Sequence, residues 1–172
     1  SSKTIDALKQ QVERVQPRMV EWRRHIHQNA ELSGQEIQTA AYVAKHLRAL
    51  GYEVRERVGG TGVLGVLKGA KPGRTVALRA DMDALPVAEA SGLPFASKQR
   101  QAYMGTEVPV AHSCGHDGHT AMLMGAAEVF AGMRDQISGT IVLVFQPAEE
   151  GAPHELKEGE KFGAAAMVAD GA

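Results

Sequence analysis

The sequence has little cysteine, few aromatic residues and almost no net charge. Its 172 residues include one cysteine, which excludes a disulfide within the chain and leaves the redox compartment open. The formal charge of -1 excludes the strongly basic surface of a nucleic-acid or anionic-membrane binder. No apolar run approaches the roughly 20 residues that span a membrane. The first residue is Ser1 rather than methionine, which is compatible with removal of a leader. The compartment of the protein therefore stays open: the cytoplasm or, after removal of a leader, the periplasm or the exterior.

The remaining composition is that of an ordinary folded domain. Hydrophobic residues make up 44% of the chain and charged residues 23%, which excludes a disordered or fibrous protein. A chain of this length suits one domain and buries enough apolar surface to fold without a disulfide or a metal ion.

Hydrophobic periodicity predicts helices that alternate with short strands. The predicted helices cover residues 5–26, with a kink or a break at Pro17, and residues 35–50, 117–133 and 163–168. Val12 and Ile37 lie on the apolar faces of the first two helices. The predicted strands cover residues 52–55, 62–67, 75–79 and 139–145, and a long loop with short strands covers residues 86–111. This alternation predicts an α/β class: a three-layer α/β/α arrangement with a central, mostly parallel or mixed sheet.

Two pairs of carboxylates come directly after predicted strands. Asp81 and Asp83 follow the strand at 75–79, and Glu149 and Glu150 follow the strand at 139–145. Ligands of open α/β sheets bind beyond the carboxyl ends of the strands. Each pair alone has an ordinary explanation, as a turn or as a solvated loop. Each pair therefore becomes evidence for a ligand site only together with other groups.

A third cluster, at residues 112–119, concentrates the metal-binding side chains of the sequence. Three of the seven histidines and the only cysteine fall within these eight residues. Cys114 and His116, separated by one glycine, can both reach one ion from a tight loop. A single histidine is more often a structural residue, but this density favours a metal site. A structural zinc site normally has four ligands in spaced pairs, and the missing second pair argues against one.

The three clusters together resemble the M20 metallopeptidase and amidohydrolase family. The matching segments are Arg-Ala-Asp-Met-Asp-Ala-Leu-Pro at 79–86, His-Ser-Cys-Gly-His-Asp-Gly-His at 112–119 and Gln-Pro-Ala-Glu-Glu-Gly at 146–151. The closest branch is that of aminoacylase, hippurate hydrolase and indole-acetyl-amino-acid hydrolase. The resemblance implies a zinc-exopeptidase-like catalytic domain with two divalent metal ions per complete site, either zinc or manganese, cobalt or nickel.

The resemblance also assigns roles to single residues. Cys114, His116 and Glu150 match metal ligands of the family, and Glu149 matches its general base. Asp83 matches the carboxylate that supports the ligands from behind.

The remaining polar residues of the clusters are expected near the metal ions without binding them. Asp81 stands where related branches carry a metal-binding histidine, and we expect it beside the site. His112, Asp117 and His119 are expected to support the ligands or to cap the following helix. His27 belongs to a further matching motif and is interpreted as structural.

The activity that the resemblance implies is hydrolysis of the amide bond of N-acyl amino acids, related small amides or dipeptides. A hydroxide that bridges the two ions would attack the carbonyl, and Glu149 would take the proton and pass it to the leaving amine. The expected partner is this small-molecule substrate, with neither nucleic acid nor membrane. A homodimer stays open for the full-length protein.

The family's usual length implies that the chain is one part of a catalytic domain. Members are more than twice as long and add an inserted lid or dimerisation domain, a C-terminal return segment and further histidine ligands. Residues 1–172 are therefore interpreted as the N-terminal part of a metallohydrolase domain that is inactive alone.

Two other function classes remain open at this point. One is a non-catalytic, truncated module that binds a metal ion or a partner. The other, less favoured, is a cysteine hydrolase that uses Cys114. It lacks the strand–nucleophile–helix turn of such enzymes and leaves Glu149 and Glu150 without a role.

Overall fold

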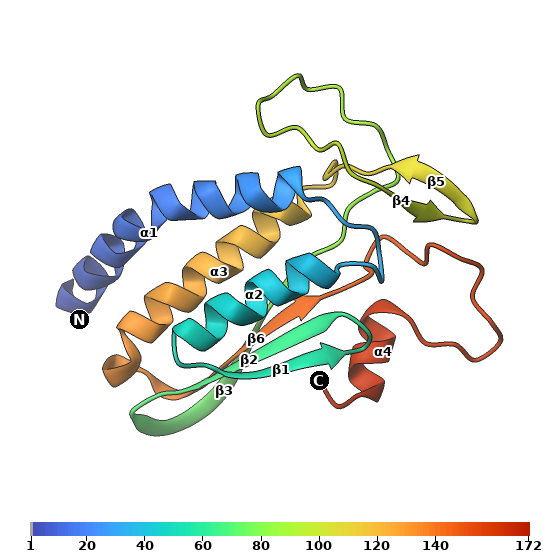
Figure 1. Ribbon diagram of the computed structural model, residues 1–172. Helices are drawn as coiled ribbons and strands as arrows, with labels where there is room; N and C mark the ends of the chain where they lie inside the picture. Colours follow the sequence, from blue (N-terminus) through green and yellow to red (C-terminus); the bar gives the residue numbers. More distant parts are fainter. Residues whose placement is uncertain (1) are drawn as a thin grey trace.

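The central strand of the fold is β6, which joins an antiparallel and a parallel half of one sheet. The computed structural model describes residues 2–172 (Figure 1). The sheet contains β1 (Glu53–Val58), β2 (Gly62–Lys68), β3 (Lys71–Asp81) and β6 (Ser138–Gln146), in the order β1-β2-β6-β3. β6 pairs antiparallel with β2 and parallel with β3. The sheet is therefore mixed, which confirms the predicted class.

The helices and a small hairpin complete the fold. The helices are α1 (Ser2–Gln28), α2 (Ile37–Ala49), α3 (His116–Gly132) and α4 (Gly163–Ala169), with a 3-10 turn at Arg134–Gln136. β4 (Arg100–Tyr103) and β5 (Thr106–Pro109) pair with each other apart from the main sheet. Each predicted helix and strand is present within a few residues of its expected bounds. Among the described residues, no helix combines the length and apolarity needed to cross a membrane.

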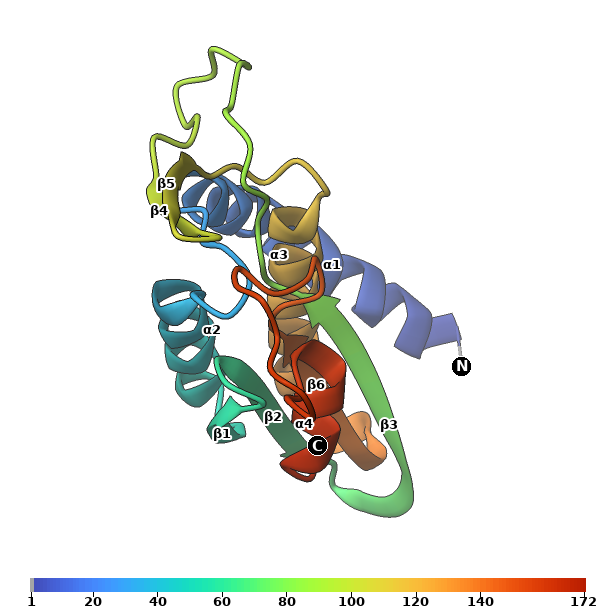
Figure 2. The same ribbon diagram turned by 90° about the vertical axis from the view of Figure 1, so that its right-hand side faces the viewer.

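The two faces of the sheet are covered unequally. α2 and α3 lie over one face (Figures 1 and 2), where Val63, Leu143 and Phe145 are buried, and α1 packs on α3 on the same side. Leu64 and Val144, whose side chains point to the opposite face, pack against Met167 of α4. Within the described chain the third predicted layer thus consists of one short helix.

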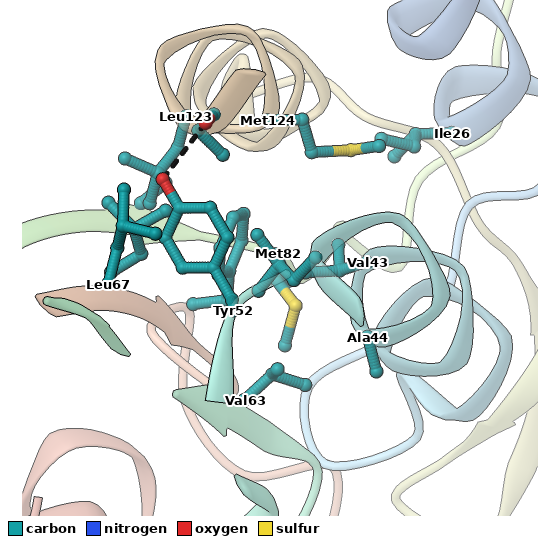
Figure 3. Close-up of a cluster of buried hydrophobic side chains, with 14 residues drawn as sticks. Ile26, Val43, Ala44, Tyr52, Val63, Leu67, Met82, Leu123 and Met124 are labelled. Atoms are coloured by element: carbon teal, nitrogen blue, oxygen red, sulfur yellow. Dashed lines mark hydrogen bonds between the residues drawn. The ribbon is translucent and has the colours of Figure 1, made fainter. Parts of the chain in front are cut away.

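The main core lies between the sheet and helices α1 to α3 (Figure 3). Leu47 of α2, Met124 of α3 and Leu143 of β6 are fully buried there. The hydroxyl of Tyr52 donates a hydrogen bond of 2.9 Å to the backbone carbonyl of Ala127, which links the end of α2 to α3. The core therefore fixes both helices relative to the strands.

α1 passes Pro17 without a break. The helix is continuous, and its axis changes direction partway along (Figure 1). Proline removes one backbone hydrogen bond and crowds the preceding turn, which bends a helix without ending it. The expectation of a kink is therefore met by a single bent helix. Its apolar face is buried at Val15 and Ile26, whereas Val12 is exposed.

The parallel pairing of β3 and β6 brings the carboxylate clusters together. α3 lies on the crossover between the two strands, and Asp81 is paired with Gln146 at their carboxyl ends. The amide of Met82 donates a hydrogen bond of 2.9 Å to the carbonyl of Gln146 one residue later. The residues that follow both strands therefore leave the sheet at the same edge.

Glu36, the residue before α2, carries a carboxylate that is completely buried. It accepts hydrogen bonds from the hydroxyl of Thr61 and from the amide of Ala148. Burial raises its pKa from 4.5 to about 7, against the opposing effect of these hydrogen bonds. A buried acid of this kind makes the stability of the fold depend on pH.

Leu143→Ala is expected to lower the free energy of unfolding by about 2–5 kcal/mol, because it leaves a cavity at the centre of the core. Leu156→Ala makes the same chemical change at an exposed position and should change it by less than about 0.5 kcal/mol. Urea unfolding followed by circular dichroism measures both. Equal losses in the two variants would contradict this description of the core.

Glu36→Gln is expected to flatten the pH dependence of stability. The raised pKa means that the folded state holds the Glu36 proton more tightly than the unfolded state does. The contribution of Glu36 to the free energy of unfolding therefore falls as the pH rises from about 4.5 to about 7, by about 3 kcal/mol at 1.4 kcal/mol per pKa unit. Glutamine cannot ionise, so the variant lacks this fall. Urea unfolding of both proteins across this range tests it, and parallel pH profiles would contradict it.

Candidate metal centre

The site lies where β3 and β6 end and α3 begins. Gly115, directly before α3, has a φ of +92°, a conformation that glycine adopts without strain. Among the described residues, apart from the neighbours of Gly115 along the chain, no atom lies within 4 Å of the position of a Cβ there, so the requirement comes from the backbone and not from crowding. This turn presents Cys114 and His116, on either side of Gly115, to the strand ends.

His116 is held by Asp83. Its Nδ1 lies 2.9 Å from the carbonyl oxygen of Asp83 and 3.2 Å from the carboxylate Oδ1. Asp83 is fully buried and also accepts hydrogen bonds from the hydroxyl of Ser33 and the amide of Glu150, at 2.7 and 2.9 Å. A histidine whose Nδ1 is bonded to a carboxylate has its Nε2 free for a metal ion.

The free Nε2 of His116 faces three carboxylates. Glu149 Oε2 lies at 3.7 Å, Glu150 Oε1 at 3.8 Å and Asp81 Oδ2 at 4.0 Å. The donor atoms of Cys114, His116 and Glu150 all lie within 4.8 Å of one another. Sulfur, nitrogen and oxygen donors at this separation suit one ion of the zinc type.

The electrostatics of the cluster also fit a cation. Burial lowers the pKa of His116, but the contacts with Asp83 and the charge of Asp81 outweigh it and raise the pKa to about 9. Contact with Glu150, then burial, raises the pKa of the Cys114 thiol. Glu150 Oε1 is buried and has no hydrogen-bond partner in the described part of the chain. A divalent ion would satisfy this oxygen and offset the carboxylates.

Asp81 and His119 form a second group with His116. Asp81 Oδ2 lies 3.6 Å from Nδ1 of His119, and the three donor atoms lie within 4.8 Å of one another. However, Arg79 contacts Asp81 at 3.1 Å and already supplies a positive charge. Since His116 has one free nitrogen, it can serve one group at a time. This geometry fits the expectation that Asp81 lies beside the ligands.

Asp117 faces away from the cluster, toward α1. It receives hydrogen bonds from Nε of Arg23 at 3.0 Å and contacts Nδ1 of His27 at 2.9 Å, while Nε2 of His27 contacts Glu89 at 2.8 Å. Asp117 therefore connects the first turn of α3 to α1. His112 is buried beside this network, and burial lowers its pKa to about 4, so it is neutral.

The structure thus brings together the residues that the sequence singled out, in three groups. The predicted ligands, the base and the supporting carboxylate form the centre, which consists of Cys114, His116, Glu149, Glu150 and Asp83. Asp81 and His119 flank this centre, and His112 and Asp117 lie on the side of α1. Sequence reasoning assigned no role to Ser33 or Glu36, which hold Asp83 and Ala148. Both belong to a polar stretch before α2 whose significance depends on contacts distant in the sequence.

Comparison with known proteins identifies a matching family and similar proteins. Residues 77–172 match the model of peptidase family M20/M25/M40. Thermostable carboxypeptidase 2 of Saccharolobus solfataricus is 50% identical over 147 residues, which cover 85% of this chain and 35% of that protein. N-acyl-L-amino acid amidohydrolase of Geobacillus stearothermophilus is 44% identical over 155 residues, covering 90% and 40% respectively. The chain therefore spans about a third to two fifths of the length of these relatives.

A solved structure is also similar to this chain in sequence and in fold. The YXEP protein of Bacillus subtilis, described as a dinuclear metal-binding peptidase, is 37% identical with a TM-score of 0.71. The match covers 80% of this chain and 36% of that protein.

His116→Ala is expected to weaken Co²⁺ binding by the chain at least about tenfold, because it removes the central nitrogen donor. His154→Ala is the matched control, since His154 is exposed and pairs with Glu160 away from the site. Titration followed by the visible spectrum of cobalt measures both. Equal affinities in wild type, His116→Ala and His154→Ala would contradict the location of the site.

Proposed function

The chain belongs to peptidase family M20/M25/M40, and on this premise we propose that it is part of a metal-dependent hydrolase of N-acyl amino acids or related small amides and dipeptides. The observation that carries the proposal is the convergence of Cys114, His116 and Glu150 beside the half-exposed carboxylate of Glu149. Metal ligands with an adjacent free carboxylate are the parts that metal-assisted hydrolysis requires.

The proposed substrate class rests on what the relatives share. A carboxypeptidase and an N-acyl-amino-acid amidohydrolase both cleave an amide bond whose nitrogen belongs to an amino acid with a free carboxylate. The reaction is therefore proposed as hydrolysis of that bond. The acyl group and the amino acid side chain would be selected by a pocket formed in the whole protein.

In this proposal Cys114, His116 and Glu150 hold metal, and Asp83 orients His116. Divalent ions bound there would lower the pKa of water toward neutrality and polarise the scissile carbonyl. Zinc suits the thiolate, and manganese, cobalt or nickel can use the same nitrogen and oxygen donors. Three ligands are too few for two ions, so further ligands must come from elsewhere in the protein.

Glu149 is assigned as the general base. Its side chain is 41% exposed, and Oε2 lies 3.7 Å from Nε2 of His116, next to the proposed ligands. It is therefore open to solvent beside the proposed ligands, where a water molecule and the substrate would approach. The carboxylate would accept a proton from the attacking water and later donate it to the departing amine.

We propose further that the chain is the N-terminal part of the catalytic domain of a longer enzyme. Its relatives are more than twice as long as the segment that they share with it. The missing ligands agree with this interpretation, and the 172 residues alone are expected to be inactive.

The contacts of Cys114 weigh against a cysteine hydrolase. A nucleophilic cysteine needs a lowered pKa, whereas contact with Glu150 raises that of Cys114. A non-catalytic metal-binding module would keep the ligands but would have no use for a base at Glu149.

Glu149→Gln in the full-length hydrolase that contains these residues is expected to lower kcat by about 10²–10⁴-fold, because it removes the proton acceptor. The metal content should not change, since Glu149 is not a proposed ligand. Turnover of N-acetyl amino acids and plasma mass spectrometry measure the two quantities.

Glu155→Gln, in the exposed loop after the site, is the control and should keep normal turnover. Near-normal turnover of Glu149→Gln would contradict the base assignment. Activity of the wild type that survives a chelator would favour the cysteine mechanism, and absence of turnover in the metal-loaded enzyme on all substrates of this class would favour the binding module.

A further inference from the structure

The buried carboxylate of Glu36 reaches the loop that carries the proposed base. Its Oε1 accepts a hydrogen bond of 2.8 Å from the amide of Ala148, and its Oε2 accepts one from the hydroxyl of Thr61. Glu36 and Ala148 are 112 residues apart in the sequence. The contact therefore ties the start of α2 to the residue directly before Glu149.

Ala148 adopts a backbone conformation that alanine rarely takes. Its φ is +56°, in the left-handed region where a Cβ is unfavourable, and the residue is buried. This residue turns the chain after β6 and sets the directions in which Glu149 and Glu150 leave the backbone. A strained residue persists only where its surroundings impose it.

The surroundings of Ala148 do impose this conformation. Glu36 holds its amide, and the carbonyl of Ala148 lies 2.6 Å from where a Cβ on Gly163 would be, so the start of α4 packs closely on the same residue. Two residues later, the amide of Glu150 donates to Asp83. Two buried carboxylates thus hold alternate amides of one loop, with Glu149 between them.

We infer that Glu36 is a positioning residue for Glu149 and Glu150, acting by holding the Ala148 amide and with it the left-handed turn. The inference rests on the proposed function, which gives these two glutamates their roles. An acid buried at this position is unfavourable by itself, because burial raises its pKa. An apolar side chain would avoid that cost but would leave the Ala148 amide unpaired and the turn unsupported.

The test compares variants that keep or remove the acceptor for the Ala148 amide. Glu36→Gln keeps an oxygen at Oε1, and Glu36→Met fills similar space without an acceptor. Thr61→Val is the matched control, since it removes the hydrogen bond from the Thr61 hydroxyl to Glu36 and leaves the one from the amide of Ala148. The double variant Glu36→Met with Ala148→Gly replaces the strained alanine with a residue that adopts a positive φ freely.

Two readouts on the 172-residue chain separate positioning from general stability. Co²⁺ affinity reports the placement of Glu150, and amide hydrogen exchange measured by NMR at residues 148–150 reports the turn without any metal. Glu36→Met should weaken Co²⁺ binding about tenfold or more and speed exchange at residues 148–150 by a similar factor. Exchange in β2 should change less. Glu36→Gln and Thr61→Val should stay within about threefold of wild type on both readouts, and the glycine double variant should recover most of the Co²⁺ affinity.

The inference is overturned if Glu36→Met matches wild type at residues 148–150, or if Glu36→Gln is as damaging as Glu36→Met. It is also overturned if exchange rises equally throughout the chain, since that result indicates a purely structural role. If wild type binds no Co²⁺, the ligand assignment fails, and the exchange rates alone decide whether Glu36 holds the turn. Should Glu36→Met not fold, Glu36→Asp, which withdraws the carboxylate by one methylene, takes its place.

Discussion

The buried carboxylate of Asp83 is the contact on which the geometry of the site depends. It bonds to the hydroxyl of Ser33, to Nδ1 of His116 and to the amide of Glu150, so one side chain joins the segment before α2, the start of α3 and the loop after β6. Burial raises its pKa, but these hydrogen bonds outweigh burial and hold the pKa below its usual range. The anion is therefore stable, and loss of its charge would weaken three hydrogen bonds at once.

Together with Asp83, three further carboxylates concentrate negative charge around His116. Asp81, Glu149 and Glu150 place carboxylate oxygens within 4.0 Å of its Nε2, and the same field keeps protons on His116 and on Cys114. Such a cluster is unfavourable unless a positive charge lies within it. Protons and a divalent ion compete for these donors, so the arrangement that raises both pKa values is also one that suits a metal ion.

Hydrophobic periodicity predicted the helices and the strands, because those elements follow from local patterns, and their alternation predicted a mostly parallel or mixed sheet. It did not predict what covers each apolar face. Ile37, on the apolar face of α2, is 70% exposed, and Val12 of α1 is exposed as well. A period of three and four residues identifies which side chains share a face, but burial depends on elements that pack from elsewhere in the fold. Likewise, local patterns did not predict that, in the described part of the chain, the third layer of the predicted architecture consists of α4 alone.

The residues at the centre of the site could be proposed from the sequence because their types and motifs are visible there. The density of histidine and cysteine at residues 112–119 favours a metal site by itself, whereas the roles of Glu149 and Glu150 came from the resemblance to the M20 family. Glu36 and Ser33 carry no such signal, since many polar side chains precede helices. A residue that holds another residue's backbone needs only an acceptor at the right place. Its role can therefore be inferred only from the folded structure, in which the acceptor contacts the amide of a residue with a strained backbone, as Glu36 contacts that of Ala148.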